Sequence, residues 1–253
     1  MTTAMNKNLV LVFLLALMTV FIPQAALVYV LPAATKIDTG DTAWILVSTA
    51  LVMLMTPGLA LFYGGMSRSK SVLNMMMMSF GAMAVVGIVY VLWGWSMSFA
   101  GTDVGTLFGN PFTAFGLEGV GADSYVYVAF QMTFAVITAA LISGAMADRV
   151  KFSAWMVFVP IWITLSYFPL AHMVWGGGWL ADMGAWDFAG GTVVHINAGA
   201  AAFVAAIVVG RRSGYGSTSV LPHNVPTVLL GAGLLWFGWF GFNAGSALAA
   251  SPI

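Results

Sequence analysis

The chain lacks cysteine altogether and carries very little charge. None of its 253 residues is cysteine and only 6% are charged, against about 25% in typical soluble proteins. The missing thiols exclude a disulfide framework, a thiolate metal site and a cysteine nucleophile. The scarcity of charge, together with 61% apolar residues, excludes a water-soluble globule.

Neither sign of charge is in excess. Eight basic residues balance eight acidic ones, so the formal net charge is zero. Binding to a nucleic-acid backbone requires a basic surface that neutralises phosphates. The sequence therefore excludes nucleic acid as the partner.

Long apolar runs are what the chain has instead. A transmembrane helix needs about 20 apolar residues, and the few charged residues separate runs of roughly that length. The runs cover residues 9–31, 42–63, 72–100, 125–147, 152–170, 190–210 and 225–248. They predict an all-α, polytopic helix bundle that crosses the cytoplasmic membrane several times.

Basic residues mark every second connection between these runs. They occur at 68–70, 149–151 and 211–212, whereas the intervening connections carry acidic residues. Short cytoplasmic loops retain positive charge. We therefore expect the three basic loops to share the cytoplasmic side, with the acidic loops outside.

Residues 1–34 allow two interpretations. Lys7 followed by an apolar run has the pattern of a signal peptide, but the run is also long enough to remain as a membrane helix. We expect one of these two, followed by a single membrane domain over residues 35–253.

Two ionisable residues lie in or beside an otherwise apolar helix. Asp187 precedes the run at 190–210 and His195 lies in its first turns, where an ionisable group is costly and marks a candidate functional site. Small residues at offsets of 3, 4, 7 and 11 share the helix face of His195, so we expect His195 to point into the bundle. The structural alternatives are an interhelical hydrogen bond for His195 and a helix N-cap for Asp187.

The most informative blocks resemble those of the ammonium transporter (Amt) family, which is related to the Rhesus proteins. DFAGGTVVHINAG is similar to the family signature, and TPGLALFYGGMSRSKSVLNM, FQMTFAVITAALISGAMADRVKF, AHMVWGGG and WFGWFGFNAGSA are similar to its other blocks, in the same order. The resemblance covers residues 41–248. It implies uptake of ammonium by a channel-like transporter.

The resemblance also implies an outer cation site. In it, Phe134 is the aromatic ring beneath the cation and Phe130 lies one turn towards the vestibule. Trp175 walls the site, Ser246 accepts a hydrogen bond from the cation, and Asp187 is the buried acid that organises it. Aromatic faces attract cations, and a hydroxyl acceptor distinguishes ammonium from potassium, which has no N–H to donate.

A gate and a pore histidine follow. By resemblance, Phe242 is the second ring of a gate stacked on Phe134, and His195 is the first of two pore histidines. An apolar path makes passage of the intact cation costly, so deprotonation becomes competitive and a neutral imidazole is suited to relay the proton. The resemblance implies no cofactor and no metal site.

The family fold has two inverted five-helix repeats and a final helix. Compared with this family fold, residues 35–253 supply the first repeat and one helix of the second, which makes about six transmembrane helices. We therefore expect a C-terminally truncated sequence that does not transport alone. The resemblance further implies ammonium or ammonia as substrate with methylammonium as an analogue, a homotrimer, and a PII-type regulatory protein on the cytoplasmic face.

Other function classes compete with the transport function. An ammonium sensor would share the outer site but carry a signalling domain, and a Rhesus-type gas channel would differ at Trp175 and Ser246. A haem redox protein needs two histidines at matching depth, and His195 is the one histidine expected well inside a span. No serine, histidine and acid fall at a common depth, so an enzyme is not expected.

Overall fold

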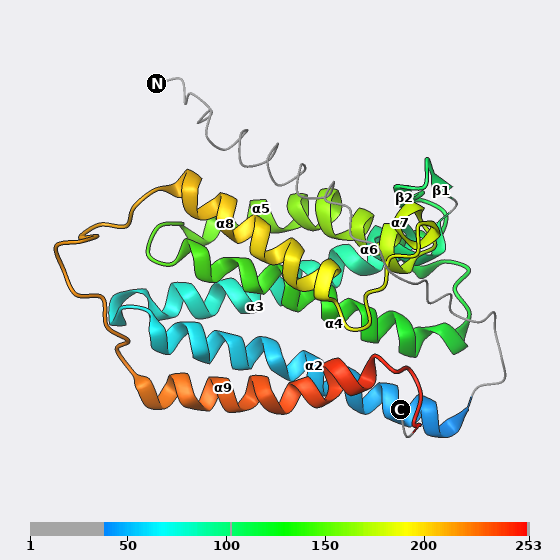
Figure 1. The fold of residues 1–253 in the computed structure, drawn as a ribbon, viewed down its shortest axis with the longest axis horizontal. Helices are drawn as coiled ribbons and strands as arrows, with labels where there is room; N and C mark the ends of the chain where they lie inside the picture. The colour runs from blue at the N-terminus through cyan, green and yellow to red at the C-terminus, as the bar shows by residue number, and fades with distance from the viewer. Residues whose placement is uncertain (1–37, 102, 252–253) are drawn as a thin grey trace.

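The computed structural model describes residues 38–101 and 103–251. The expected signal peptide or extra helix in residues 1–34 lies outside this part of the chain. The described chain is a bundle of long helices that run roughly along one axis (Figure 1). Its α-helices are α2 (Thr39–Met66), α3 (Val72–Val89), α4 (Tyr125–Ile142), α5 (Phe152–Trp162), α6 (Phe168–Trp175), α7 (Trp179–Asp182), α8 (Asn197–Val209) and α9 (Val225–Trp239).

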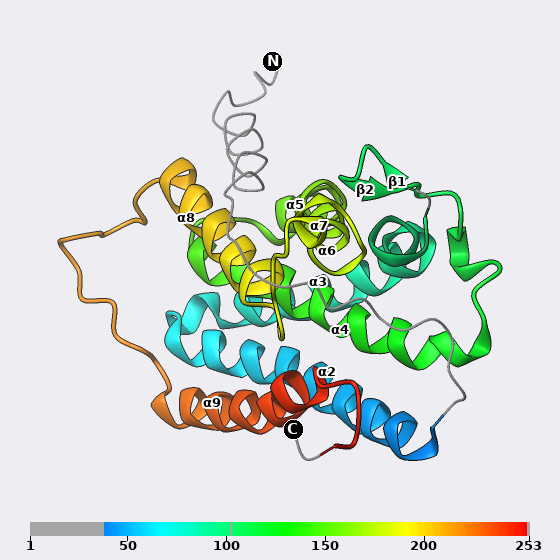
Figure 2. The same cartoon turned by 45° about the vertical axis from the view of Figure 1, so that its right-hand side comes forward.

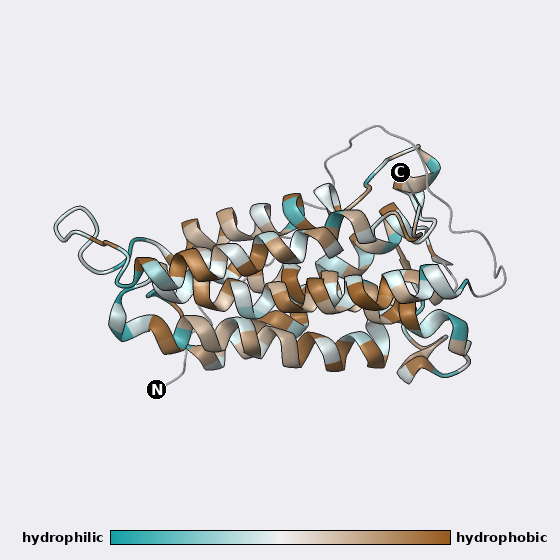
Figure 3. Ribbon diagram, turned by 90° about the horizontal axis from the view of Figure 1, so that it is seen from below, coloured by the Kyte–Doolittle hydropathy of each residue, from teal (hydrophilic) through white to brown (hydrophobic). Residues whose placement is uncertain are grey.

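Six helical segments of the described chain are long and apolar enough to cross a membrane. They are Thr39–Met66, Ser69–Gly94, Ala122–Met146, Phe152–Asp182, Gly191–Val209 and Val225–Ala244. The expected runs from residue 42 onwards are thereby confirmed, although the fourth segment continues beyond residue 170 and includes Trp175. Figure 3 shows hydrophobic residues along the helices and most of the hydrophilic ones towards the two ends.

The loop between α3 and α4 contains a small exception to the all-α class. Strands β1 (Asp103–Val104) and β2 (Phe108–Gly109) pair antiparallel, with Asp103 opposite Gly109. This hairpin lies at the same end of the bundle as α7 (Figures 1 and 2). The Trp179 backbone N–H donates to the Thr106 carbonyl at 3.2 Å, which ties α7 to the hairpin.

Several spans widen from α-helix into π-helical turns. These turns cover Tyr90–Gly94, Ser96–Ala100, Ile163–Tyr167, Gly191–Ile196 and Phe240–Ala244. A π turn inserts one extra residue and redirects the side chains around it, and such turns are frequent at functional sites. His195 and Phe242 both lie in these turns.

Helices α2 and α9 pack side by side (Figures 1 and 2). Gly231 of α9 lies so near the backbone of Phe62 and Gly58 that an added Cβ would overlap it. Small residues allow membrane helices to approach closely. This contact positions the turn after α9, which carries Phe242, against the rest of the bundle.

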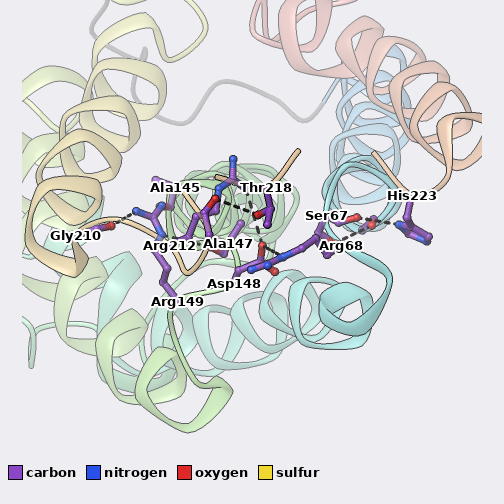
Figure 4. Close-up of polar contacts among 12 residues, drawn as sticks. Ser67, Arg68, Ala145, Ala147, Asp148, Arg149, Gly210, Arg212, Thr218 and His223 are labelled. Atoms are coloured by element: carbon purple, nitrogen blue, oxygen red, sulfur yellow. Dashed lines mark hydrogen bonds and ion pairs between the residues drawn. The ribbon is translucent and has the colours of Figure 1, made fainter. Parts of the chain in front are cut away.

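The basic loops meet at one end of the bundle (Figure 4). Arg68 donates from Nε to Asp148 Oδ2 at 2.8 Å, and Arg212 Nη1 lies 3.9 Å from the same oxygen. Arg149 donates to the carbonyls of Gly210, at 2.6 Å, and Ala145. The prediction that these loops share one side is confirmed, and their assignment to the cytoplasm stays a prediction.

Arg149 is charged in surroundings that disfavour charge. Burial lowers the pKa of Arg149, and nearby Arg212 lowers it further, while Asp148 raises it. The carbonyl oxygens that accept its N–H groups offset part of this cost. Arg149 thereby joins the α4–α5 loop to the end of α8.

Candidate functional site

A cavity of about 240 Å³ lies towards the end opposite the basic loops. Its walls come from the first half of α4, the end of α6, the segment before α8 and the segment after α9. The lining residues are Tyr127, Phe130, Gln131, Phe134, Trp175, Trp186, Asp187, Phe188, Ser246, Ala247 and Leu248. All five residues expected at the outer site are among them.

Aromatic rings form one wall and the floor of this cavity. The ring centroids of Phe130 and Phe134 are 4.9 Å apart in an edge-to-face arrangement. Phe134 also meets Trp175 edge-to-face at 6.1 Å. These spacings fall within the range preferred by aromatic pairs, so the rings hold one another in place.

Beneath the cavity the ring series continues to the expected pore histidine. Phe242 stacks on Phe134 with centroids 4.2 Å apart and planes 19° from parallel. The centroid of the His195 ring lies 5.7 Å from that of Phe242. The series of ring contacts therefore runs from Trp175 through Phe134 and Phe242 to His195.

Asp187 caps the helix that carries His195. Its Oδ1 accepts from the N–H groups of Gly190, at 2.6 Å, and Gly191, at 2.8 Å. Its Oδ2 accepts from those of Thr192, at 2.8 Å, and Val193, at 2.9 Å. The N-cap, which the sequence offered as the structural alternative for Asp187, is therefore confirmed; the carboxylate satisfies the free N–H groups of the helix start and complements its dipole.

Two further hydrogen bonds near the cap orient Trp175 and leave the Ser246 hydroxyl able to accept. Trp175 donates its indole N–H to the Asp187 carbonyl at 2.7 Å, which sets the orientation of the ring. Ser246 donates its hydroxyl proton to the Phe242 carbonyl at 2.8 Å. The lone pairs of the Ser246 hydroxyl therefore remain to accept a hydrogen bond from a guest.

The expected burial of His195 is not observed in the described chain. His195 is exposed, and a Cβ added at Gly199 would meet no atom within 4 Å. Helix α8 packs instead through Ala198, Ala201 and Ala205, and only the first of these belongs to the predicted face. The π-helical turn at Gly191–Ile196 changes the register between His195 and α8, so offsets counted on a regular α-helix mislead.

The expectation that His195 is the one histidine well inside a span was also wrong. His172 lies on α6 and is only 1% exposed, with Nδ1 3.3 Å from the Ser98 carbonyl oxygen. It is therefore a second histidine inside a span. His223, at the basic end, has Nδ1 2.9 Å from the Ser67 carbonyl oxygen.

Sequence reasoning missed the polar pair Tyr127 and Gln131 in the cavity wall. Gln131 donates its amide N–H to the Tyr127 hydroxyl at 2.8 Å, and it is 7% exposed. The signal was present, because a side-chain amide in the middle of an apolar membrane run is costly and marks a functional position.

A larger cavity of about 640 Å³ lies elsewhere in the bundle and is almost wholly apolar. It is lined by Trp93, Met97, Leu107, Phe108, Pro111, Phe112, Phe115, Thr164, Leu165, Pro169 and Met173. Its hydroxyl, on Thr164, already donates to the Pro160 carbonyl and accepts from Trp93. This cavity offers little to compensate a cation for lost water, unlike the smaller one.

Comparison with known proteins points to one family. The model of the Ammonium Transporter Family matches residues 43–253. An ammonium transporter of Mycobacterium tuberculosis is 54% identical over 248 residues, covering 85% of this chain and 52% of that protein. The chain spans about half the length of the curated relatives that it matches.

Solved structures that resemble this chain point to the same family. The Mep2 structure from Candida albicans superposes with a TM-score of 0.78 at 36% identity, covering 85% of this chain and 50% of that one. A structure described as a sensor Amt protein superposes with a TM-score of 0.78 at 31% identity, covering 84% and 56%.

Proposed function

Because the chain belongs to the Ammonium Transporter Family and is a multi-pass membrane protein, we propose that the protein takes up ammonium across the cytoplasmic membrane. The observation that carries this proposal is the continuous ring series from Trp175 through Phe134 and Phe242 to His195. The cavity at its start is the entry site, and His195 lies beyond the closed stack.

The cavity suits a small monovalent cation. The faces and edges of Phe130, Phe134 and Trp175 surround it, and each ring face attracts a cation by about 0.5 to 2 kcal/mol, depending on desolvation. The Ser246 hydroxyl supplies an acceptor for one N–H of ammonium. The site would therefore favour ammonium over potassium, which matches the charge but donates no hydrogen bond.

Passage beyond the cavity requires the stacked pair to part. At 4.2 Å between centroids, Phe134 and Phe242 are in van der Waals contact, so neither ammonium nor ammonia fits between them. We propose that, as the rings part, ammonium gives its proton to the neutral imidazole of His195, that ammonia passes the rings, and that His195 hands the proton on towards the basic end. Desolvation favours this separation of ammonium into ammonia and a proton, because a bare cation in an apolar passage is costly.

Asp187 acts in this scheme as a positioning residue. Four backbone N–H groups occupy its carboxylate oxygens, which leaves the cation to the rings and the hydroxyl. Its backbone carbonyl fixes Trp175. Asp187 thereby sets the geometry of both the cavity wall and the turn that carries His195.

The assembly and regulation are further parts of the proposal. Family membership supports a homotrimer with a path in each subunit, and the basic end formed by the loops at 67–71, 147–151 and 210–224 is the face on which a PII-type protein would dock. Methylammonium would enter the same cavity as an analogue.

A sensor of ammonium is the second candidate function. It is favoured by the close structural match to a protein described as a sensor Amt protein. Both functions use the same cavity, and they differ in whether substrate crosses the membrane.

Growth and uptake distinguish the two functions. The full-length protein containing this chain is expressed in bacteria that lack their own ammonium transporters, at low external ammonium. Transport predicts restored growth and saturable uptake of labelled methylammonium. A sensor would bind ammonium without restoring growth, and uptake no greater than in empty-vector cells, from protein that reaches the membrane, would contradict the proposal.

A further inference from the structure

We propose that Gln131 is a second hydrogen-bond acceptor for ammonium in the cavity, acting together with Ser246. The proposal rests on the function proposed above and adds a residue that determines specificity. It follows from the hydrogen bonds that the cavity side chains already make and from the one oxygen that they leave without a partner.

One N–H of the Gln131 amide has a hydrogen-bond partner, whereas the amide oxygen has none. Its Nε2 donates to the Tyr127 hydroxyl at 2.8 Å. Its Oε1 is buried and has no hydrogen-bond partner within the part of the chain that the structure describes. A buried amide oxygen without a partner is destabilising, and a guest in the cavity that Gln131 lines could supply the missing donor.

Two of the neighbouring polar groups have already given their protons to the backbone. The Trp175 indole N–H and the Ser246 hydroxyl proton are already given to backbone carbonyls. The Asp187 carboxylate is occupied by backbone N–H groups. Acceptor capacity therefore remains on Ser246 and Gln131, beside donors on Trp186, on the Tyr127 hydroxyl and on the second N–H of the Gln131 amide.

Ammonium matches this arrangement chemically. It offers four N–H donors and no acceptor, so two of its hydrogen bonds can be made while the rings hold its charge. Potassium has no N–H, and methylammonium has one fewer than ammonium and carries a methyl group in its place. A second acceptor therefore strengthens selection of ammonium over both.

The test removes the oxygen while keeping the length of the side chain. In the full-length protein, Gln131→Met is expected to raise the half-saturation concentration for ammonium uptake about tenfold, as expected for one lost hydrogen bond to a charged group. The maximal rate should change less, inhibition by potassium should increase, and the half-saturation concentration for methylammonium should rise less than that for ammonium.

Two variants separate an acceptor from a merely structural role. Tyr127→Phe breaks the same side-chain hydrogen bond but keeps the Gln131 oxygen, so it should shift half-saturation less than Gln131→Met. Thr133→Val removes a different buried hydroxyl from α4, one that donates to the Phe130 carbonyl at 2.6 Å, and should leave half-saturation unchanged.

Gln131→Glu keeps an acceptor oxygen and covers the case in which the methionine variant fails to fold. It should give half-saturation no higher than the unsubstituted protein. A tenfold rise in Gln131→Glu, an unchanged value in folded Gln131→Met, or an equal shift in Tyr127→Phe would each overturn the proposal. Absence of saturable uptake in the unsubstituted protein would instead overturn the proposed function, and this proposal with it.

Discussion

At the scale of single residues, the proposed cation site depends most on Trp175. Its ring meets Phe134 at 6.1 Å and its indole N–H is bound to the Asp187 carbonyl. A tryptophan face is the strongest aromatic partner for a cation. In the proposed function, Trp175 therefore contributes both attraction and shape to the entry cavity.

Replacing Trp175 with leucine should weaken cation selection. Loss of one ring face predicts about a tenfold rise in the half-saturation concentration for ammonium, measured as uptake by the full-length protein. Trp236→Leu is the matched control, because Trp236 is 71% exposed on α9 and lies outside the cavity. Equal shifts in the two variants would remove Trp175 from the site.

Individual residues differ in how far sequence alone could place them. The cap at Asp187 could be offered as an alternative from sequence because Asp187 stands just ahead of paired glycines at a helix start, which is a local pattern. The exposure of His195 was not predicted, because it depends on a π turn and on which helices cover that side. Gln131 was overlooked because it belonged to no assigned role, although its polarity in an apolar run was visible.

At the scale of elements, the start of the segment that carries His195 depends on its cap. Asp187→Ala removes the acceptor of four backbone N–H groups, and loss of an N-cap costs about 0.5 to 2 kcal/mol. We expect a lower thermal midpoint of the detergent-solubilised protein. Asp182→Ala, at an exposed acid on α7, should leave it unchanged, and equal midpoints would contradict the capping role.

The contact between α2 and α9 gives a second prediction at this scale. An added Cβ at Gly231 overlaps the backbone of α2, whereas one at Gly233 meets nothing within 4 Å. Gly231→Ala should destabilise the protein by about 1 to 3 kcal/mol through overpacking, and Gly233→Ala should stabilise it by about 0.5 to 1 kcal/mol. The same direction of change in thermal midpoint for both would show that the close approach is unimportant.

The spans themselves were largely predictable, since charged residues are excluded from the membrane interior and so mark the ends of apolar runs. The π-helical turns were not. A π turn such as Phe240–Ala244 has no distinct composition and arises from how its helix packs on its neighbours. The stacking of Phe242 on Phe134 therefore came from resemblance to a family, never from periodicity.

At the scale of the whole molecule, the two ends of the bundle differ in composition. One end holds the cavity and the other holds the basic loops, which Asp148 joins through Arg68 and Arg212. The side chain of Asp148 is 2% exposed, so its charge is desolvated and depends on these partners.

Asp148→Asn should loosen the three basic loops together. Losing hydrogen bonds to a charged group costs about 1.5 to 3 kcal/mol, and we expect faster proteolysis in the exposed stretch 213–220. Glu118→Gln, at an exposed acid in the loop between α3 and α4, is the matched control. Equal cleavage rates in both variants would show that Asp148 does not hold the loops.

The measurement that tests the central claim most directly is the initial rate of ammonium uptake into liposomes containing the full-length protein or its His195→Ala variant. Because His195 is exposed in the described chain, the variant should keep its thermal midpoint. The account predicts a rate lower by about a hundredfold, as expected for loss of a proton-transfer group. An unchanged rate from the folded variant would contradict the path from Trp175 to His195.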